Sequence, residues 1–193
     1  MPVSGDHDVA AFEAILRKII DPTGATTRGP QTPARAPRPA RLRGIRIGFV
    51  DTAKQNADLL LTRLALELAE AYGVEVTSRQ TKHGSGLPLD APLLHDMAGE
   101  CDVVVIGVGD CGSSCVSAIA DGIAFERAGV PSAVICSDAF DVTARATAEV
   151  QGDPGYGYVT TPHPVASLTP DLISRRAAEL LAPVVARISL ETP

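Results

Sequence analysis

From residue 42 onward, the chain alternates between short aliphatic runs and longer amphipathic stretches, with only a few residues in most connections. Strands are expected at 45–50, 74–81, 102–108, 132–136 and 156–160. Helices are expected at 56–72, 91–99, 113–128, 139–150 and 168–188. This alternation is typical of a parallel sheet covered by helices on both faces. The sequence therefore predicts a three-layer, doubly wound α/β fold with five parallel strands. The flavodoxin-like order 2-1-3-4-5 is our first choice, with right-handed crossovers.

The core of this fold must be aliphatic. Hydrophobic residues make up 45% of the 193 residues, whereas aromatic residues make up 4% and tryptophan is absent. The 102–108 run (DVVVIGV) is almost continuously β-branched, as expected of a central strand covered on both faces. The longest apolar runs are much shorter than the roughly 20 residues that span a membrane. The first eight residues carry no signal-peptide pattern. We therefore expect a cytoplasmic protein without a membrane partner.

The N-terminal part is interpreted as a helix and an arm (1–42) that precede the α/β domain (43–193). An amphipathic helix is expected at 9–20. Its apolar face is formed by Val9, Phe12, Leu16 and Ile19 or Ile20. Residues 21–42 are rich in Pro, Thr, Gly and Arg, which predicts an extended arm. A lone helix must bury its apolar face on the main domain or on a second subunit, so we expect a homodimer.

The net charge of −6 disfavours nucleic acid and anionic membrane surfaces as partners. Six arginines between Arg28 and Arg46 are a local exception. Most of them alternate with prolines, so a solvated arm is the simplest interpretation, and a phosphate contact is the alternative. The expected partner is a small-molecule substrate, which could be anionic.

Ligands of an open parallel sheet bind beyond the carboxyl ends of its strands, beside the switch in strand order. For the order 2-1-3-4-5, this switch lies between the first and third strands. Polar and nucleophilic residues gather at four of the strand ends. These segments are 51–56 (DTAKQN), 107–115 (GVGDCGSSC), 136–138 (CSD) and 161–164 (TPHP). We expect them to form the site together.

Cys111 lies where the third strand has ended and a helix is about to begin. Backbone N–H groups and the helix dipole favour a negative charge there, which lowers the pKa of a thiol and produces the nucleophilic thiolate. Cys111 is therefore the predicted nucleophile, with a small buried residue as the alternative. Its neighbours form the expected substrate-binding loop, in which glycines let the backbone approach a ligand. They are Gly109, Asp110, Gly112, Ser113 and Ser114.

Three further residues complete the expected catalytic set. Cys115 follows Cys111 by one helical turn and Cys136 ends the adjacent strand, so either could resolve a product on Cys111. Packing in the core is the alternative for both. His163, between two prolines at the last strand end, is the histidine placed for acid–base chemistry, although a structural role is equally compatible. Cys101 precedes its strand, and we expect it to be structural at the opposite edge.

The segment after the first strand supplies three more candidates. Lys54 could neutralise a substrate carboxylate or hold Cys111 as a thiolate. Asn56 could orient a carbonyl group or cap the following helix. Asp51 belongs to the substrate-binding set, but it could also be only the polar residue of a strand end. Asp121, nearly three helical turns after Cys111, is expected to make a structural hydrogen bond.

No cofactor or metal is expected. Residues 107–112 match a G-x-G-x-x-G pattern, but a dinucleotide site needs this motif after the first strand rather than the third. The cysteines are not spaced as zinc ligands. Ser113 and Ser114 do not lie in the G-x-S-x-G sequence that a serine nucleophile of this fold class requires.

The chain resembles the UGSC family, which is named for selenocysteine-Gly-Ser-Cys at the strand-to-helix turn. Its members commonly carry cysteine in the selenocysteine position. The resemblance covers nearly the whole chain from Ile20. It rests on 20–24 (IDPTG), 36–44 (APRPARLRG), 51–58 (DTAKQNAD), 107–113 (GVGDCGS), Asp121, 126–131 (ERAGVP) and 162–164 (PHP).

In this resemblance, Cys111 takes the selenocysteine position, and Ser114 lies where the family has its second cysteine. Cys115 follows one residue later. A C-x-x-C pair can close a disulfide across one helical turn, whereas a C-x-x-x-C pair needs a locally unwound helix. The resemblance implies thiol or selenol redox chemistry.

Three functions follow from these residues. The first is a thiol-dependent oxidoreductase, in which Cys111 attacks a peroxide, a disulfide or a carbon–heteroatom bond and a second cysteine resolves the product. The second is covalent catalysis without redox change, as in a hydratase, lyase or transferase. Cys111 would add to a nitrile, an acyl group or an activated double bond, and Lys54, Asn56 and backbone N–H groups would bind the developing anion. The third is a non-enzymatic small-molecule-binding subunit.

Overall fold

The computed structural model describes residues 35–191, and its centre is a five-stranded parallel sheet. The strands are β1 (Arg46–Asp51), β2 (Glu75–Thr81), β3 (Val103–Gly109), β4 (Ser132–Ser137) and β5 (Val159–Thr161). Their order is β2-β1-β3-β4-β5, and every pairing is parallel. The predicted flavodoxin-like α/β fold is thus confirmed, and the switch in strand order lies between β1 and β3.

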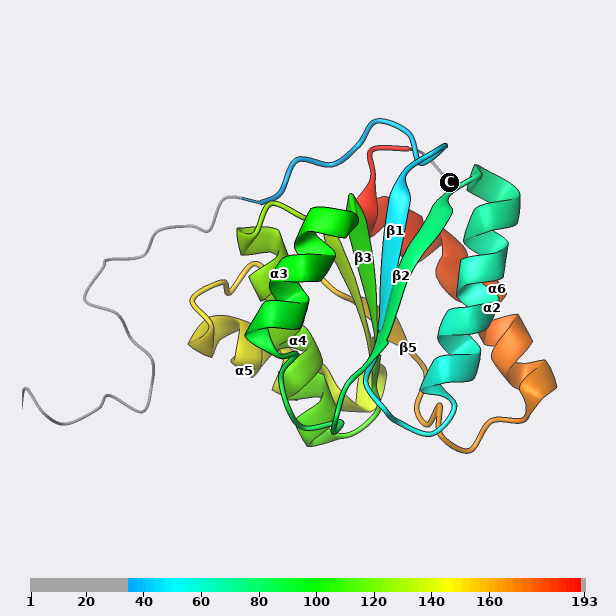
Figure 1. Cartoon of the computed structure of the whole chain (residues 1–193). Helices are drawn as coiled ribbons and strands as arrows, with labels where there is room; N and C mark the ends of the chain where they lie inside the picture. The colour runs from blue at the N-terminus through cyan, green and yellow to red at the C-terminus, as the bar shows by residue number, and fades with distance from the viewer. Residues whose placement is uncertain (1–34, 192–193) are drawn as a thin grey trace, which may run out of the picture. The chain divides into compact units, whose positions relative to one another are not determined.

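Helices cover both faces of the sheet (Figure 1). On one face lie α2 (Ala57–Tyr72) and α6 (Pro170–Ile188), which pack against each other. On the other face lie α3 (Ala91–Glu100), α4 (Gly112–Arg127) and α5 (Asp141–Val150), with a 3₁₀ turn at Asp138–Phe140 before α5. Within residues 35–191, no helix is both long enough and apolar enough to cross a membrane.

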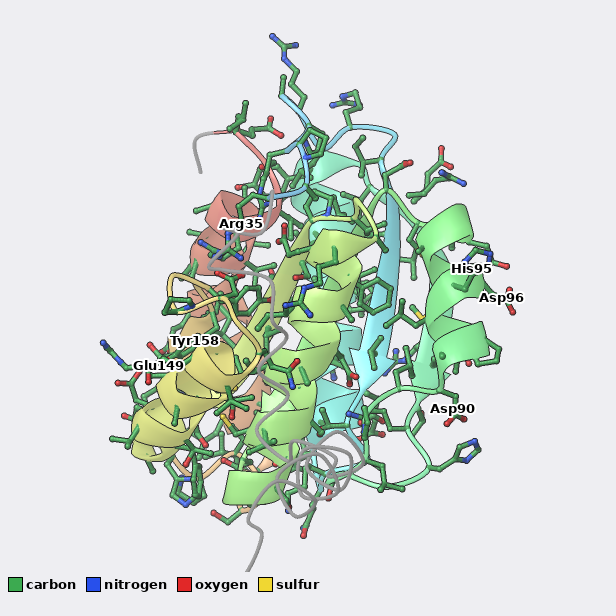
Figure 2. The ribbon with its side chains drawn as sticks, turned by 90° about the vertical axis from the view of Figure 1, so that its left-hand side faces the viewer. Arg35, Asp90, His95, Asp96, Glu149 and Tyr158 are labelled. Carbon is green, nitrogen blue, oxygen red and sulfur yellow. The ribbon has the colours of Figure 1, made fainter. Side chains whose placement is uncertain are left out.

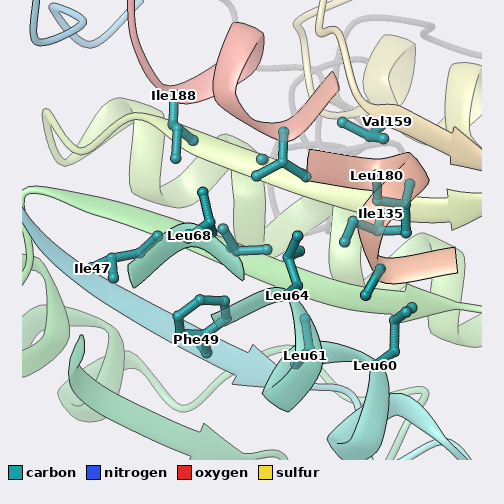
Figure 3. Packing of buried hydrophobic residues seen from close by; sticks show 14 of the residues in the cluster. Ile47, Phe49, Leu60, Leu61, Leu64, Leu68, Ile135, Val159, Leu180 and Ile188 are labelled. Carbon is teal, nitrogen blue, oxygen red and sulfur yellow. The ribbon is translucent and has the colours of Figure 1, made fainter. Parts of the chain in front are cut away.

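The core consists of two aliphatic layers, one on each side of the sheet. Alternate residues of a strand point to opposite faces, so Ile47 and Phe49 of β1 pack under α2 and α6, whereas Val50 faces α3 and α4. Figure 3 shows the first layer, in which Leu64 and Leu68 of α2 lie over the strands. Because both faces of the central strands are covered, all seven residues of β3 are buried.

Strand β5 differs from its expected extent. It begins at Val159, and Tyr156 lies outside it with a buried phenol. The Tyr156 hydroxyl lies 2.8 Å from Ser132 Oγ, and a side chain at Gly122 would lie 2.2 Å from that hydroxyl. The ring therefore occupies the space above α4 that the glycine leaves, and this packing replaces strand pairing at that position.

Of the arginines between Arg28 and Arg46 that lie within residues 35–191, three form ion pairs within the chain. Arg38 binds Glu126 at 2.6 Å, Arg35 binds Asp153 at 2.6 Å, and Arg46 binds the exposed Asp102 at 2.8 Å. The interpretation of a solvated arm is wrong for Arg35 and Arg38, because Glu126 and Asp153 are buried and need a paired cation. Figure 2 shows Arg35 toward the end of the sheet where the strands begin.

Residues 35–42 lie against the α/β domain, where Ala36 N–H donates to Glu126 at 3.0 Å and Leu42 is fully buried. The expected helix at 9–20, the first part of the arm and the homodimer contact inferred from them lie outside the described residues.

Candidate active site

The four polar segments meet at the carboxyl edge of the sheet. Thr52, after β1, donates from its hydroxyl to Val108 O of β3 at 2.9 Å. Ser137, which ends β4, donates to Gly109 O at 3.1 Å, and its hydroxyl lies 3.3 Å from His163 Nδ1. The ends of β1, β3, β4 and β5 are thus hydrogen-bonded to one another, as the predicted strand order requires.

Cys111 is the N-cap of α4, and its sulfur is bound by the helix that it begins. The sulfur accepts from Ser114 N–H at 3.4 Å, while Ser114 Oγ accepts from the N–H groups of Cys111 and Asp110, each at 3.1 Å. This reciprocal arrangement is a capping box. The sulfur also lies 3.0 Å from Ser114 Oγ and 3.5 Å from Ser113 Oγ, and the residue is partly exposed. Donors thus converge on a thiol that a small molecule can reach.

These donors change the acidity of the thiol. Burial alone would raise the pKa of Cys111, because it disfavours the thiolate. The hydroxyls of Ser113 and Ser114, the Ser114 N–H and the Lys54 side chain stabilise the thiolate more strongly, so the pKa of Cys111 is lowered from 9.0 to about 6. At neutral pH, the thiol is therefore mostly ionised. Cys101, at the amino edge, shows the opposite case, because burial raises its pKa.

Asp110 connects the Cys111 turn to His163. Its buried carboxylate accepts from Val165 N–H at 3.0 Å, from Ala166 N–H at 2.9 Å and from His163 Nδ1 at 3.1 Å. Burial raises the pKa of Asp110, but these donors outweigh burial and lower it, so the group is a carboxylate at neutral pH. A carboxylate can only accept, so Nδ1 carries the proton and Nε2 is the ring nitrogen that can take up or release one.

His163 is held on three sides. Its N–H donates to Asp138 Oδ1 at 3.0 Å, and its ring packs edge-on against Phe140, with the centroids 5.4 Å apart. Together with the bond to Asp110, these contacts fix the ring while leaving 37% of the side chain exposed. An oriented, reachable imidazole of this kind suits acid–base chemistry.

The residues after β1 have partners of their own. Asn56 Nδ2 donates to the carbonyls of Val165, Ala166 and Leu168 at 2.9 to 3.1 Å, so its side chain binds one loop of the site to another. Asn56 occupies the N-cap position of α2, but its side chain makes no capping hydrogen bond there. Asp51 accepts from Ala53 N–H at 2.8 Å, and burial raises its pKa. Lys54 is the residue of this segment that acts on Cys111, through its effect on the thiol pKa.

A buried ion pair beneath the site was not anticipated from the sequence. Lys82, directly after β2, donates to Asp121 Oδ2 at 2.6 Å and to Ser117 Oγ at 2.9 Å. Asp121 also accepts from Leu89 N–H at 2.8 Å, which confirms its expected structural hydrogen bond. The pair attaches the loop at 82–90 to the helix that carries Cys111. One signal was available: Lys82 follows a strand at the same edge, and Ser114, Ser117 and Asp121 share one face of a helix.

Cys115 and Cys136 are fully buried and contact each other, with their sulfurs 3.3 Å apart. Gly109 lies beside them. A Cβ at this glycine would lie 2.8 Å from Cys136 Sγ and 2.9 Å from Cys115 Cα, so no side chain fits there. A Cβ at Gly112, in contrast, would have no atom within 4 Å, so the backbone next to Cys111 borders open space. The two predicted loop glycines thus differ. Gly109 lets the two buried cysteines pack closely, whereas Gly112 leaves the space beside Cys111 open.

A hollow of about 490 Å³ also lies in the described part of the chain, but at the opposite edge of the sheet. Its lining includes Arg38, Cys101 and Pro131. None of the predicted site residues lines it, so we place the candidate site by its chemistry, at Cys111.

Fold and site together define a class: a flavodoxin-like α/β protein with an ionised thiol at a helix start, beside an Asp–His pair. Comparison with protein-family models matches the UGSC family over residues 18–190. The chain therefore belongs to the UGSC family, as the sequence resemblance indicated. A search of curated proteins found no match.

Proposed function

We propose that this protein is a cysteine-dependent enzyme in which the Cys111 thiolate is the covalent nucleophile. One observation carries the proposal: the Cys111 sulfur, at the start of α4, is bound by an N–H and two hydroxyls that lower its pKa to about 6. A thiolate that is both ionised at neutral pH and partly exposed is the form in which cysteine attacks an electrophile.

The surroundings of the sulfur favour addition chemistry. The thiolate would form a bond to an electrophilic carbon of a nitrile, an acyl group or an activated double bond. The π electron pair of the electrophile would move to its nitrogen, oxygen or α-carbon, and His163 Nε2 would deliver the proton there. Asp110 supports this role because it holds Nδ1–H and stabilises the imidazolium. Water, deprotonated by His163 Nε2, would then attack the carbon bonded to sulfur. The C–S bond would break with its electron pair on sulfur, which releases the product and regenerates the thiolate. For an acyl substrate, its own leaving group would first depart with the proton from Nε2.

The contacts of Cys115 also favour addition over redox turnover. A resolving thiol must reach the oxidised Cys111, whereas Cys115 is fully buried with its sulfur 3.3 Å from Cys136. Ser114, whose hydroxyl contacts the Cys111 sulfur, cannot form a disulfide. Hydration, elimination and group transfer through a Cys111 adduct need no second thiol.

A thiol oxidoreductase is the second candidate. The observation in its favour is the low pKa of a partly exposed thiol, which also suits attack on a peroxide. This reaction would need Cys115 to leave its contact with Cys136, or an external thiol to resolve the product.

Acrylamide, an activated alkene, tests the nucleophile. At pH 7, intact-mass and peptide analysis should find one adduct, at Cys111, in the wild type and in Cys115→Ser, and none in Cys111→Ser. His163→Asn should slow adduct formation about 10-fold or more, because the acid is lost. Cys101→Ser, at the opposite edge, is the matched control and should react as the wild type does. Equal labelling of Cys111 and the other cysteines would contradict the proposal.

Turnover of hydrogen peroxide in the presence of dithiothreitol separates the two candidates. Addition chemistry predicts that Cys111→Ser leaves the rate of repeated peroxide reduction nearly unchanged, because Cys111 is not the redox centre. If Cys111→Ser abolishes repeated peroxide reduction, the oxidoreductase is the correct function.

A further inference from the structure

The proposed chemistry at Cys111 leaves Cys115 and Cys136 without a role, yet these residues form a defined pair. Cys115 lies in the first turn of α4 and Cys136 in β4, 21 positions apart in the sequence. Their sulfurs lie 3.3 Å apart, and neither residue is accessible to solvent. The Cys115 sulfur has only one other hydrogen-bonding contact within the described residues, to Phe140 O at 3.7 Å.

The backbone around the pair is arranged to accommodate both sulfurs. Gly109 is in register with Cys136, after an irregularity that shifts the β3–β4 pairing between Gly107 and Gly109. A side chain at Gly109 would collide with Cys136 Sγ and with the backbone of Cys115. The glycine thus leaves room for the two thiols to lie side by side between the sheet and the helix.

We propose that Cys115 and Cys136 are an oxidation site of their own, which closes to a disulfide under peroxide independently of Cys111. The sulfurs need to approach by little more than 1 Å to reach the ordinary disulfide length of about 2.05 Å. Small rotations of two short side chains can supply this movement.

The reaction balances with hydrogen peroxide as the oxidant. One thiolate attacks a peroxide oxygen, which forms a sulfenic acid and, after protonation, releases water. The second thiol attacks this sulfur, an S–S bond forms, and the sulfenic hydroxyl leaves as a second water. Two thiols thus lose two electrons and two protons, and one peroxide becomes two waters.

The acidity of the pair supports the order of attack. The hydrogen bond with Cys136 lowers the pKa of Cys115, whereas the same contact, together with burial, raises the pKa of Cys136. Cys115 is therefore the thiol that ionises first and meets the peroxide. Peroxide is small and uncharged, so it can reach a buried sulfur through transient opening of the first turn of α4.

The experiment uses the full chain with Cys111→Ser, which keeps three of the four cysteines and removes the proposed nucleophile. Hydrogen peroxide should lower the free thiols from three to one. Non-reducing peptide mapping should find a Cys115–Cys136 cross-link with the mass of two hydrogen atoms lost. The wild type should form the same cross-link at a rate within about 2-fold, and dithiothreitol should reverse it.

A stability measurement provides a second readout, and it requires no substitution of Cys115 or Cys136. A disulfide between Cys115 and Cys136 joins residues 21 positions apart and so restricts the unfolded chain. The oxidised protein should therefore melt about 5 °C or more above the reduced one. The proposal is overturned if Cys111→Ser forms no Cys115–Cys136 cross-link, because the pair then depends on Cys111. It is also overturned if the wild type joins Cys111 to Cys115 instead. Neither result alters the acrylamide test of Cys111, so the two proposals can fail separately.

Discussion

The two edges of the sheet use similar residues for different purposes. Each holds a buried carboxylate with several donors, Asp110 at the carboxyl edge and Glu126 at the amino edge. Glu126 is bound by the guanidinium of Arg38 and by the N–H groups of Ala36 and Ser132, so its charge is neutralised by a fixed cation. Asp110 is bound by backbone N–H groups and by a titratable histidine instead.

The cysteines at the two edges differ in the same way. Cys101 is buried against Gly48, and among the described residues the Thr77 hydroxyl, at 3.7 Å, is the only hydrogen-bonding contact of its sulfur. Cys111 is partly exposed and has three donors at 3.0 to 3.5 Å. The comparison teaches that surplus hydrogen-bond donors at a helix start lower the pKa of a thiol, whereas burial with few donors raises it.

The largest expected effect is a difference in alkylation between these two thiols. With a pKa of about 6, Cys111 should be roughly 90% ionised at pH 7, whereas Cys101, raised above 9.0, should be below about 1%. A brief pulse of iodoacetamide should therefore label Cys111 at least about 50-fold faster, as measured by peptide mapping. The thiolate is lost as the pH falls through 6, so labelling should slow about 10-fold between pH 7 and pH 5. Equal labelling of both thiols would contradict the predicted difference in acidity between Cys111 and Cys101.

Asp110→Asn should be the next largest change. It places an amide against two backbone N–H groups and Nδ1–H of His163, so it should lower the free energy of unfolding by about 3 kcal/mol. Asp102→Asn, at the exposed Arg46 pair of the amino edge, is the control and should cost less than about 1 kcal/mol. Urea unfolding at pH 7 measures both.

The pH dependence provides a separate check on Asp110. Its folded-state pKa is lowered, so its stabilisation is present above 3.8 and is lost as the pH falls through the folded-state value. Asp110→Asn should therefore lose less stability than the wild type between pH 5 and pH 3. An unchanged acid dependence would mean that Asp110 contributes little to folding.

Glycine substitutions test how tightly each edge is packed. Gly109→Ala places a methyl group 2.9 Å from the Cys115 backbone, which cannot rotate away, and should cost about 2–3 kcal/mol. Gly48→Ala, at the amino edge, meets the Cys101 sulfur at 2.6 Å and the flexible end of Met97 at 3.0 Å. Because both are side chains that can move, the cost should be smaller, about 1 kcal/mol. Thermal unfolding compares the two.

Gly112→Ala is the matched control, since its methyl group meets nothing within 4 Å. Its stability should change by less than about 0.5 kcal/mol. If Gly109→Ala were as harmless as Gly112→Ala, the crowding around the Cys115–Cys136 pair would be relieved more easily than the distances indicate.

The capping serine is expected to contribute less to stability than Asp110 or Gly109 does. Ser114→Ala removes the hydroxyl that accepts from Asp110 and Cys111 N–H, and should cost about 1 kcal/mol. It should also move the midpoint of the pH profile of Cys111 alkylation to a higher pH, because a donor to the thiolate is lost. Ser132→Ala, whose hydroxyl bonds to Gly122 O near the amino edge, should lower stability without moving this profile. If the midpoint of this profile stays near pH 6 in Ser114→Ala, the low pKa of Cys111 is due to its other donors.

Much of this could be predicted from the sequence. Strand β3 was recognisable because a buried parallel strand needs a continuous β-branched run. The alternation of elements predicted the doubly wound parallel sheet, and the strand order chosen first for such a sheet is confirmed. The position of Cys111 at the start of α4 followed from the same boundaries. Cys111 could therefore be singled out before any coordinates.

What could not be predicted depends on contacts between distant segments. The Lys82–Asp121 pair joins residues 39 positions apart, and the bond from His163 to Asp110 spans 53 positions. A one-dimensional pattern shows that such residues share an edge, but not which donor meets which acceptor. For this reason Asn56 was expected to face a substrate, whereas its amide binds three carbonyls of a neighbouring loop.

One hydroxyl, that of Ser114, both caps α4 and contacts the Cys111 sulfur. The acidity of the thiol therefore depends in part on the first turn of the helix, and we expect the pKa of Cys111 to rise toward its ordinary value when this turn frays. For the same reason, the labelling rate near pH 6.5 can serve as a gauge of how much of a sample has reached its native state.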